Sequence, residues 1–115
     1  MARLLTASAA VLALALSCGA AAQDKKSITK QLAENDKVQV IENTYPPGAT
    51  SELSRSAVRV VRVLKGGTLE RTFADGKKEK RTYKTGEVHI NEPGPQYSNK
   101  NVGNTTVVLY VVRLK

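Results

Sequence analysis

The sequence predicts an all-β domain, a sandwich or barrel of about seven or eight short antiparallel strands. Turn signals rich in Pro, Gly and Asn recur roughly every 8–12 residues, and no convincing helix follows the N-terminal region. The apolar run from Val107 to Val112 needs cover on both of its faces, as a strand inside a closed fold has. The pair Asp75-Gly76 separates two strand-like runs and is typical of a tight β-hairpin.

Residues 1–22 have the composition of an export signal. Arg3 gives a positive start, an apolar run follows, and Ala20 to Ala22 provide a small-residue cleavage site. The apolar run is too short to cross a hydrocarbon core of about 30 Å. We therefore expect a periplasmic or secreted protein whose mature chain begins at Gln23. Processing as a lipoprotein through Cys18 is the alternative.

The intact mass of the exported protein tests this expectation. We expect a chain that starts at Gln23 and has no cysteine, so that its core alone holds it together. A lipid-bearing N-terminal Cys18 or a retained Met1 would contradict cleavage at this place.

Two segments follow the signal. Residues 23–36 form a polar leader and an N-terminal edge segment, in which 27–35 is ambiguous between a helical turn and a strand, with a strand or irregular edge favoured. Residues 37–115 form one barrel domain. Strands are expected at 37–45, 58–64, 68–73, 78–84, 87–91 and 105–114, with a loop from 92 to 104.

The chain is basic, with a formal net charge of +8, which favours polyanions. For an exported protein, the available polyanions are envelope lipids and acidic polysaccharides. Basic residues gather in the predicted hairpin, where lysines on an edge strand also prevent aggregation. They are Arg71, Lys77, Lys78, Lys80, Arg81 and Lys84. The hairpin has too few aromatic side chains to stack bases, so no nucleic acid is expected as a partner.

Two stretches resemble the paired motifs of the cupin family. They are PPGATSELSRSAVRVVRVLKGG at 46–67 and GEVHINEPGPQYSNKN at 86–101. The resemblance extends from about Leu32 to the C-terminus and implies a cupin-like double-stranded β-barrel, or jelly roll. The motif positions that match are the scaffold residues Gly48, Gly67, Gly86, Gly94 and Asn101.

The metal-ligand positions of the two motifs do not match. They fall on Ser54, Ser56, Val60 and Tyr97, or on Gln96 if the alignment slips by one residue. None of these side chains is an imidazole or a carboxylate, the ligands that transition metals prefer. The resemblance therefore implies a degenerate metal site, and we expect no metal and no cofactor.

The resemblance also implies that positions 54, 56 and 60 face the barrel interior. Alternation along the strand then sends Arg62 to the same face. With Ser54, Ser56 and Tyr97, this guanidinium would form a small anion-binding pocket. In the alternative, Arg62 turns to solvent and its neighbours Val61 and Val63 lie inside.

These observations predict an exported, metal-free binding protein for a small anionic ligand or an envelope component. No catalytic residue is assigned. One alternative is a metal-independent enzyme of the isomerase or epimerase type, which would use Tyr97 and His89, the single histidine of the chain. The other alternative is a structural or interaction module that forms a homodimer.

Overall fold

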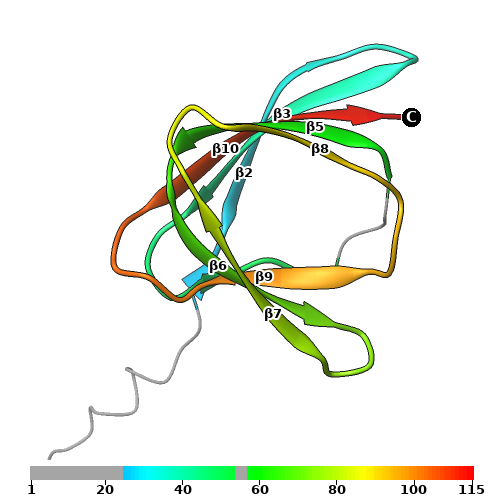
Figure 1. The fold of residues 1–115 in the computed structure, drawn as a ribbon. Coiled ribbons are helices and arrows are strands. Elements are labelled where there is room, and N and C mark those ends of the chain that lie inside the picture. Colours follow the sequence, from blue (N-terminus) through cyan, green and yellow to red (C-terminus); the bar gives the residue numbers. More distant parts are fainter. Residues whose placement is uncertain (1–24, 54–56) are drawn as a thin grey trace, which may run out of the picture.

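The computed structural model describes residues 25–53 and 57–115, and none of these residues lies in a helix. Ten strands form two five-stranded sheets that face each other (Figure 1). The first sheet has the order β1 (Lys25–Lys26), β4 (Ala49–Thr50), β9 (Tyr97–Asn101), β6 (Gly67–Phe73), β7 (Lys78–Tyr83). The second has the order β2 (Ile28–Glu34), β3 (Val38–Tyr45), β10 (Val107–Leu114), β5 (Arg59–Lys65), β8 (Val88–Asn91). No helix of the described residues is long and apolar enough to span a membrane.

The all-β, jelly-roll prediction is confirmed, but the predicted number of strands is too low. The additional strands are the two-residue β1 and β4 and the five-residue β9, which the sequence analysis placed in a loop. β9 pairs with β6 along its whole length, although its sequence YSNKN is polar. Its composition is misleading because two of its inward positions, Tyr97 and Asn99, line a polar interior rather than an apolar core.

The ambiguous segment at 27–35 is resolved as the edge strand β2. All of its residues are exposed, and it pairs with β3 in antiparallel register. The register shifts between Gln31 and Ala33, so that Leu32 forms a bulge.

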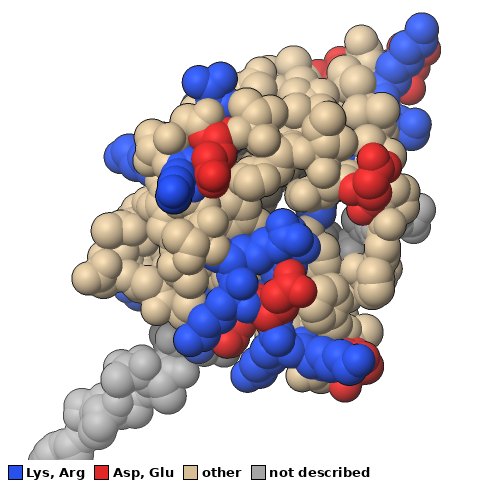
Figure 2. Space-filling model, viewed as in Figure 1, with Lys and Arg blue, Asp and Glu red and all other residues tan. Residues whose placement is uncertain are grey.

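The predicted hairpin is confirmed as β6 and β7. Gly76 takes a φ of +93°, and its amide donates to the Phe73 carbonyl at 2.9 Å. β7 is the outer strand of the first sheet, and its lysines Lys78 and Lys80 are exposed. Lys and Arg side chains gather over this hairpin with acids between them (Figure 2). The edge is therefore protected by charge, as the sequence suggests.

The scaffold residues of the two motifs hold turns and close contacts. Gly48 and Gly86 have φ values of +84° and +92°, which glycine adopts without strain. A Cβ at Gly67 would lie 2.6 Å from Val107 Cγ2, so a larger residue would push β6 away from β10. Gly94 has no comparable constraint, because a Cβ there would meet nothing within 4 Å. Asn101 is buried and bridges strands through its side-chain amide.

The barrel interior changes in character along its length. On β10 the inward side chains run from the buried apolar residues Val107, Leu109 and Val111 to the cationic Arg113. β5 shows the same change in the opposite direction, from Arg59 to Val63. Since these two strands are antiparallel neighbours, their apolar ends coincide and so do their cationic ends. One end of the barrel is a closed core, and the other is lined by charge.

Candidate functional site

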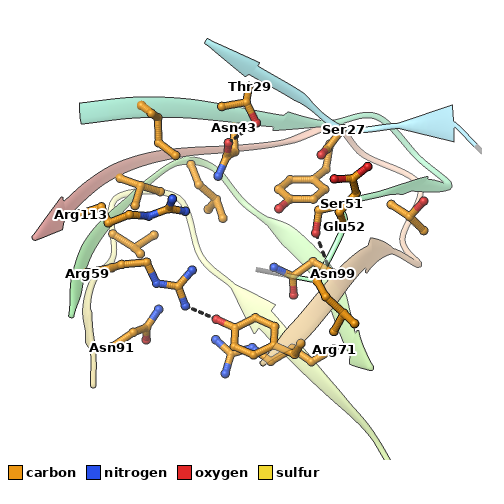
Figure 3. Close-up of a pocket in the computed structure, with 18 of the residues that line it drawn as sticks. Ser27, Thr29, Asn43, Ser51, Glu52, Arg59, Arg71, Asn91, Asn99 and Arg113 are labelled. Carbon is orange, nitrogen blue, oxygen red and sulfur yellow. Dashed lines mark hydrogen bonds between the residues drawn. The ribbon is translucent and has the colours of Figure 1, made fainter. Parts of the chain in front are cut away.

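A cavity of about 450 Å³ lies between the two sheets at the cationic end of the barrel. Its apolar wall belongs to the second sheet and consists of Ile41, Val61, Leu109 and Val111. Polar side chains from both sheets complete it, and Figure 3 shows them pointing toward the central space. A concave space with one apolar wall and convergent polar groups is the usual form of a small-molecule site.

Two arginines of the second sheet enter this cavity side by side. Arg59 on β5 and Arg113 on β10 are register partners on neighbouring strands (Figure 3). Like charges directly opposite each other destabilise a sheet unless something neutralises them. The Nε atoms of both side chains are buried without a hydrogen-bond partner among the described residues. This pair therefore presents unused donors to the cavity.

A third arginine enters from the opposite sheet. Arg71 on β6 is 8% exposed, and its Nε is also buried without a partner among the described residues. Its guanidinium carbon lies 4.2 Å from the centre of the Tyr97 ring, a cation–π contact. Its Nη2 makes a long hydrogen bond to the Tyr83 hydroxyl at 3.5 Å. We refer to Arg59, Arg71 and Arg113 as the lumen arginines.

None of the lumen arginines has a carboxylate partner among the described residues. The ion pairs found there join Glu79 to Arg81, Glu87 to His89 and Glu34 to Lys115. Glu52 is the one acid along the wall of this cavity within the described ranges, and it is exposed. Since a buried guanidinium needs a hydrogen-bonding anion or water, the lumen is electropositive and has unmet hydrogen-bonding capacity.

Tyr97 connects this cavity with a second one of about 360 Å³ toward the outside. Its hydroxyl accepts a hydrogen bond from Arg59 Nη2, and its ring packs edge-on against Phe73. Arg59, Arg71, Asn91 and Tyr97 line both cavities. Tyr97 thus lies at the boundary and orients two of the lumen arginines.

His89 lines the outer cavity. Its Nε2 lies 3.3 Å from Glu87 Oε1, and its ring packs edge-on against Tyr83. The Lys84 amide donates to the same Glu87 oxygen at 2.7 Å, and this hydrogen bond, with a smaller contribution from His89, lowers the pKa of the Glu87 carboxyl below its usual value. The histidine therefore belongs to a local polar network at the edge of β8.

The structure corrects the predicted position of Arg62. This residue is exposed on β5, whereas Val61 and Val63 are buried, so Arg62 and Val60 lie on the outer face. The alternative orientation considered above is the one observed. The predicted alternation along β5 was wrong by one residue. Because side chains of a strand point alternately to its two faces, an error of one residue exchanges the inner and outer faces.

The other predicted site residues divide into three groups. Tyr97 lines both cavities, as expected for a lumen residue. Gln96 is exposed and lines neither of them. Ser54 and Ser56 lie outside the described residues.

Sequence reasoning missed all three lumen arginines. Arg71 was counted among the exposed charges of the hairpin, but it is buried. Arg113 continues the inward alternation of Val107, Leu109 and Val111, a signal that was available in the sequence. Arg59 follows in the same way from Val61 and Val63 once the correct face is chosen.

The residues that the structure describes do not fit a metal ion. Within 25–53 and 57–115, no group of three His, Cys, Asp or Glu side chains lies close enough to bind one. Of the motif positions described, Val60 points outward, and the Tyr97 hydroxyl accepts a hydrogen bond from the Arg59 guanidinium. Three cations in the lumen would also repel a divalent ion. The interior is suited to an anion.

No family model matches the sequence, and no curated protein matches it either. Several solved structures are similar in fold. A cupin domain from Bordetella pertussis Tohama I has a TM-score of 0.73 and 22% identity, over 81% of this chain and 97% of that one. An RmlC-like cupin family protein from Methanocaldococcus jannaschii has a TM-score of 0.62 and 18% identity, over 81% and 84%.

An oxalate oxidase has a TM-score of 0.58 and 20% identity, over 80% of this chain and 52% of that one. The chain thus has the double-stranded β-helix fold of the cupins, as its two motif stretches predict. Within the described residues its site departs from the motifs, because Tyr97 stands at a metal-ligand position and the lumen arginines, which lie outside those positions, line the same cavity.

Proposed function

We propose that this chain is an exported binding protein that holds a small anionic molecule inside its barrel. The supporting observation is the convergence of the lumen arginines, whose buried Nε atoms have no partner and which pair with no carboxylate of the described residues. Burying such cations costs stability unless an anion or water satisfies them. An arginine fork matches a carboxylate or phosphate in geometry and charge.

Arg113→Gln should weaken anion binding at least about tenfold, because a hydrogen bond to a charged group contributes roughly 1.5–3 kcal/mol. Isothermal titration of the purified exported protein with succinate, inorganic phosphate and D-glucuronate measures the effect. Arg62→Gln is the matched control, since it removes the same charge from the outer face of the neighbouring strand β5. Equal affinity of both variants and the parent protein would show that the lumen arginines do not bind the anion.

A metal-independent isomerase or epimerase is a second candidate. One observation favours it, because Tyr97 and His89 line the same outer cavity. The hydroxyl of Tyr97 is held by Arg59, and Nε2 of His89 lies against Glu87, so both groups would have to exchange partners to act on a substrate. Uptake of solvent deuterium at a carbon of the bound acid, lost in His89→Ala, discriminates this candidate from simple binding.

A homodimer is a third candidate, of the structural class. The outer face of the second sheet carries exposed apolar side chains, among them Val88, Ile90 and Tyr110. In the register of the second sheet, Tyr110 of β10 lies between its two pairing partners, Arg62 of β5 and Glu42 of β3. If two copies packed these outer faces together around a two-fold axis parallel to β10, Arg62 of one copy would lie over Glu42 of the other. Sedimentation equilibrium of the exported protein discriminates a dimer from a monomer.

A further inference from the structure

We infer that the ligand of the lumen is a hydroxylated carboxylic acid, of which a hexuronic acid is the simplest fitting example. This inference rests on the proposed anion site and adds the chemical class of its ligand. It follows from the hydrogen-bonding groups that the cavity leaves unpaired, which are both donors and an acceptor.

The unpaired acceptor is Oδ1 of Asn99. This oxygen is buried and has no hydrogen-bond partner among the described residues, and Asn99 lines the cavity. Asn99 on β9 is the register partner of Arg71 on β6. The acceptor Asn99 Oδ1 and the donor Arg71 Nε, neither of which has a partner among the described residues, therefore come from adjacent positions of one sheet. Simple carboxylates are acceptors only and leave Asn99 Oδ1 unsatisfied. A hydroxyl group on the same ligand would satisfy it.

Other polar groups of the wall are already oriented toward the cavity. Thr29 Oγ1 donates to Asn43 Oδ1 at 2.8 Å, and this fixes the Asn43 amide so that its nitrogen points inward (Figure 3). Ser51 Oγ accepts a hydrogen bond from the backbone N–H of Asn99 at 2.9 Å, which leaves its hydroxyl proton available to a ligand oxygen. Such side chains, placed around one space, suit several hydroxyl groups of a single molecule.

The apolar wall agrees with the same class of ligand. Val61, Leu109 and Val111 cover one side of the cavity, opposite the polar side chains of the first sheet. The ring carbons of a sugar acid provide a matching apolar face, while its hydroxyls and carboxylate provide the polar edge. A cavity of about 450 Å³ is large enough for one such ring with ordered water.

Three ligands of similar size separate the contributions. D-glucuronate has a six-membered ring with a carboxylate and hydroxyls, cyclohexanecarboxylate has the ring and the carboxylate alone, and methyl glucoside has hydroxyls without the charge. We expect glucuronate to bind at least about tenfold more tightly than cyclohexanecarboxylate, because a site built to bond hydroxyls discriminates against ligands that lack them. Methyl glucoside should not bind measurably. Isothermal titration of the exported protein gives all three constants.

The variant Asn99→Leu tests the role of the acceptor. It should reduce the preference for glucuronate over cyclohexanecarboxylate to less than about threefold. The affinity for cyclohexanecarboxylate itself should change by less than about threefold. Asn104→Leu is the control, because Asn104 lies in the exposed loop before β10. The comparison of ligands on the parent protein stands by itself if the variant fails to fold.

Failure of the inference differs from failure of the anion site. If glucuronate and cyclohexanecarboxylate bind equally, and Arg113→Gln weakens both, the anion site is correct and the hydroxylated ligand is wrong. If phosphate, succinate and both acids all fail to bind the parent protein, the anion site itself is wrong.

Discussion

Replacing Asn101 by alanine is expected to lower the free energy of unfolding by about 3 kcal/mol. Asn101 is 1% exposed, and its Nδ2 donates to the carbonyls of Tyr45 and Thr105, each at 2.7 Å. Its Oδ1 accepts from the Gly103 amide at 2.9 Å. The side chain thus joins β9, the end of β3 and the loop that leads into β10. Alanine would leave three backbone groups without partners, of which the Tyr45 carbonyl is buried and the other two are partly buried.

Urea denaturation of the two proteins measures this loss. Asn104→Ala is the matched control, because it removes an identical side chain from an exposed position of the same loop. We expect the control to change the free energy of unfolding by less than about 0.5 kcal/mol. An Asn101→Ala loss equally small would mean that water replaces the three bonds and that the motif asparagine does not hold the barrel together.

Arg71→Met should make the ligand-free protein more stable, by about 1 kcal/mol or more, and should weaken anion binding about 100-fold. Arg71 is the most buried lumen arginine, and its hydrogen bond to the Tyr83 hydroxyl is long. Replacing a poorly satisfied buried ion by an apolar side chain of similar length is often stabilising. Removal of a desolvated charge from its bound partner costs several kcal/mol of binding.

Melting with and without D-glucuronate, together with titration, measures both effects in one variant. Arg62→Met is the control, since its side chain lies on the outer face, and it should alter neither the lumen nor the affinity. A loss of stability with unchanged affinity would contradict the proposal. Arg71 would then be a structural cation held by its contacts with Tyr97 and Tyr83.

The fold was predictable from sequence because its signals are local. The Asp75-Gly76 turn, the alternation in 37–45 and the apolar run from Val107 each need only a few neighbouring residues. β9 was missed because its inward residues show no apolar alternation. Tyr97 and Asn99 line a polar cavity, and the third, Asn101, is a buried polar residue. The two-residue strands β1 and β4 are too short to leave any pattern.

The site was less predictable because it depends on which face of β5 points inward. Both faces of this strand alternate regularly, with Arg59, Val61 and Val63 on one and Val60, Arg62 and Leu64 on the other. Each face contains one arginine, so composition does not choose between them. The pairing of Arg59 with Arg113 settles the choice, and it depends on the register of two strands far apart in the chain.

Arginine side-chain NMR tests the central claim most directly, because it observes the Nε–H groups that the structure leaves unpaired. In the purified protein labelled with ¹⁵N, added D-glucuronate should shift the Nε–H signals of the lumen arginines together, with one saturating binding curve. The chemical shift of the Arg62 Nε–H signal should not change. Signals that drift linearly with ionic strength, or a saturating shift at Arg62 without one at Arg59, Arg71 and Arg113, would contradict an anion site inside the barrel.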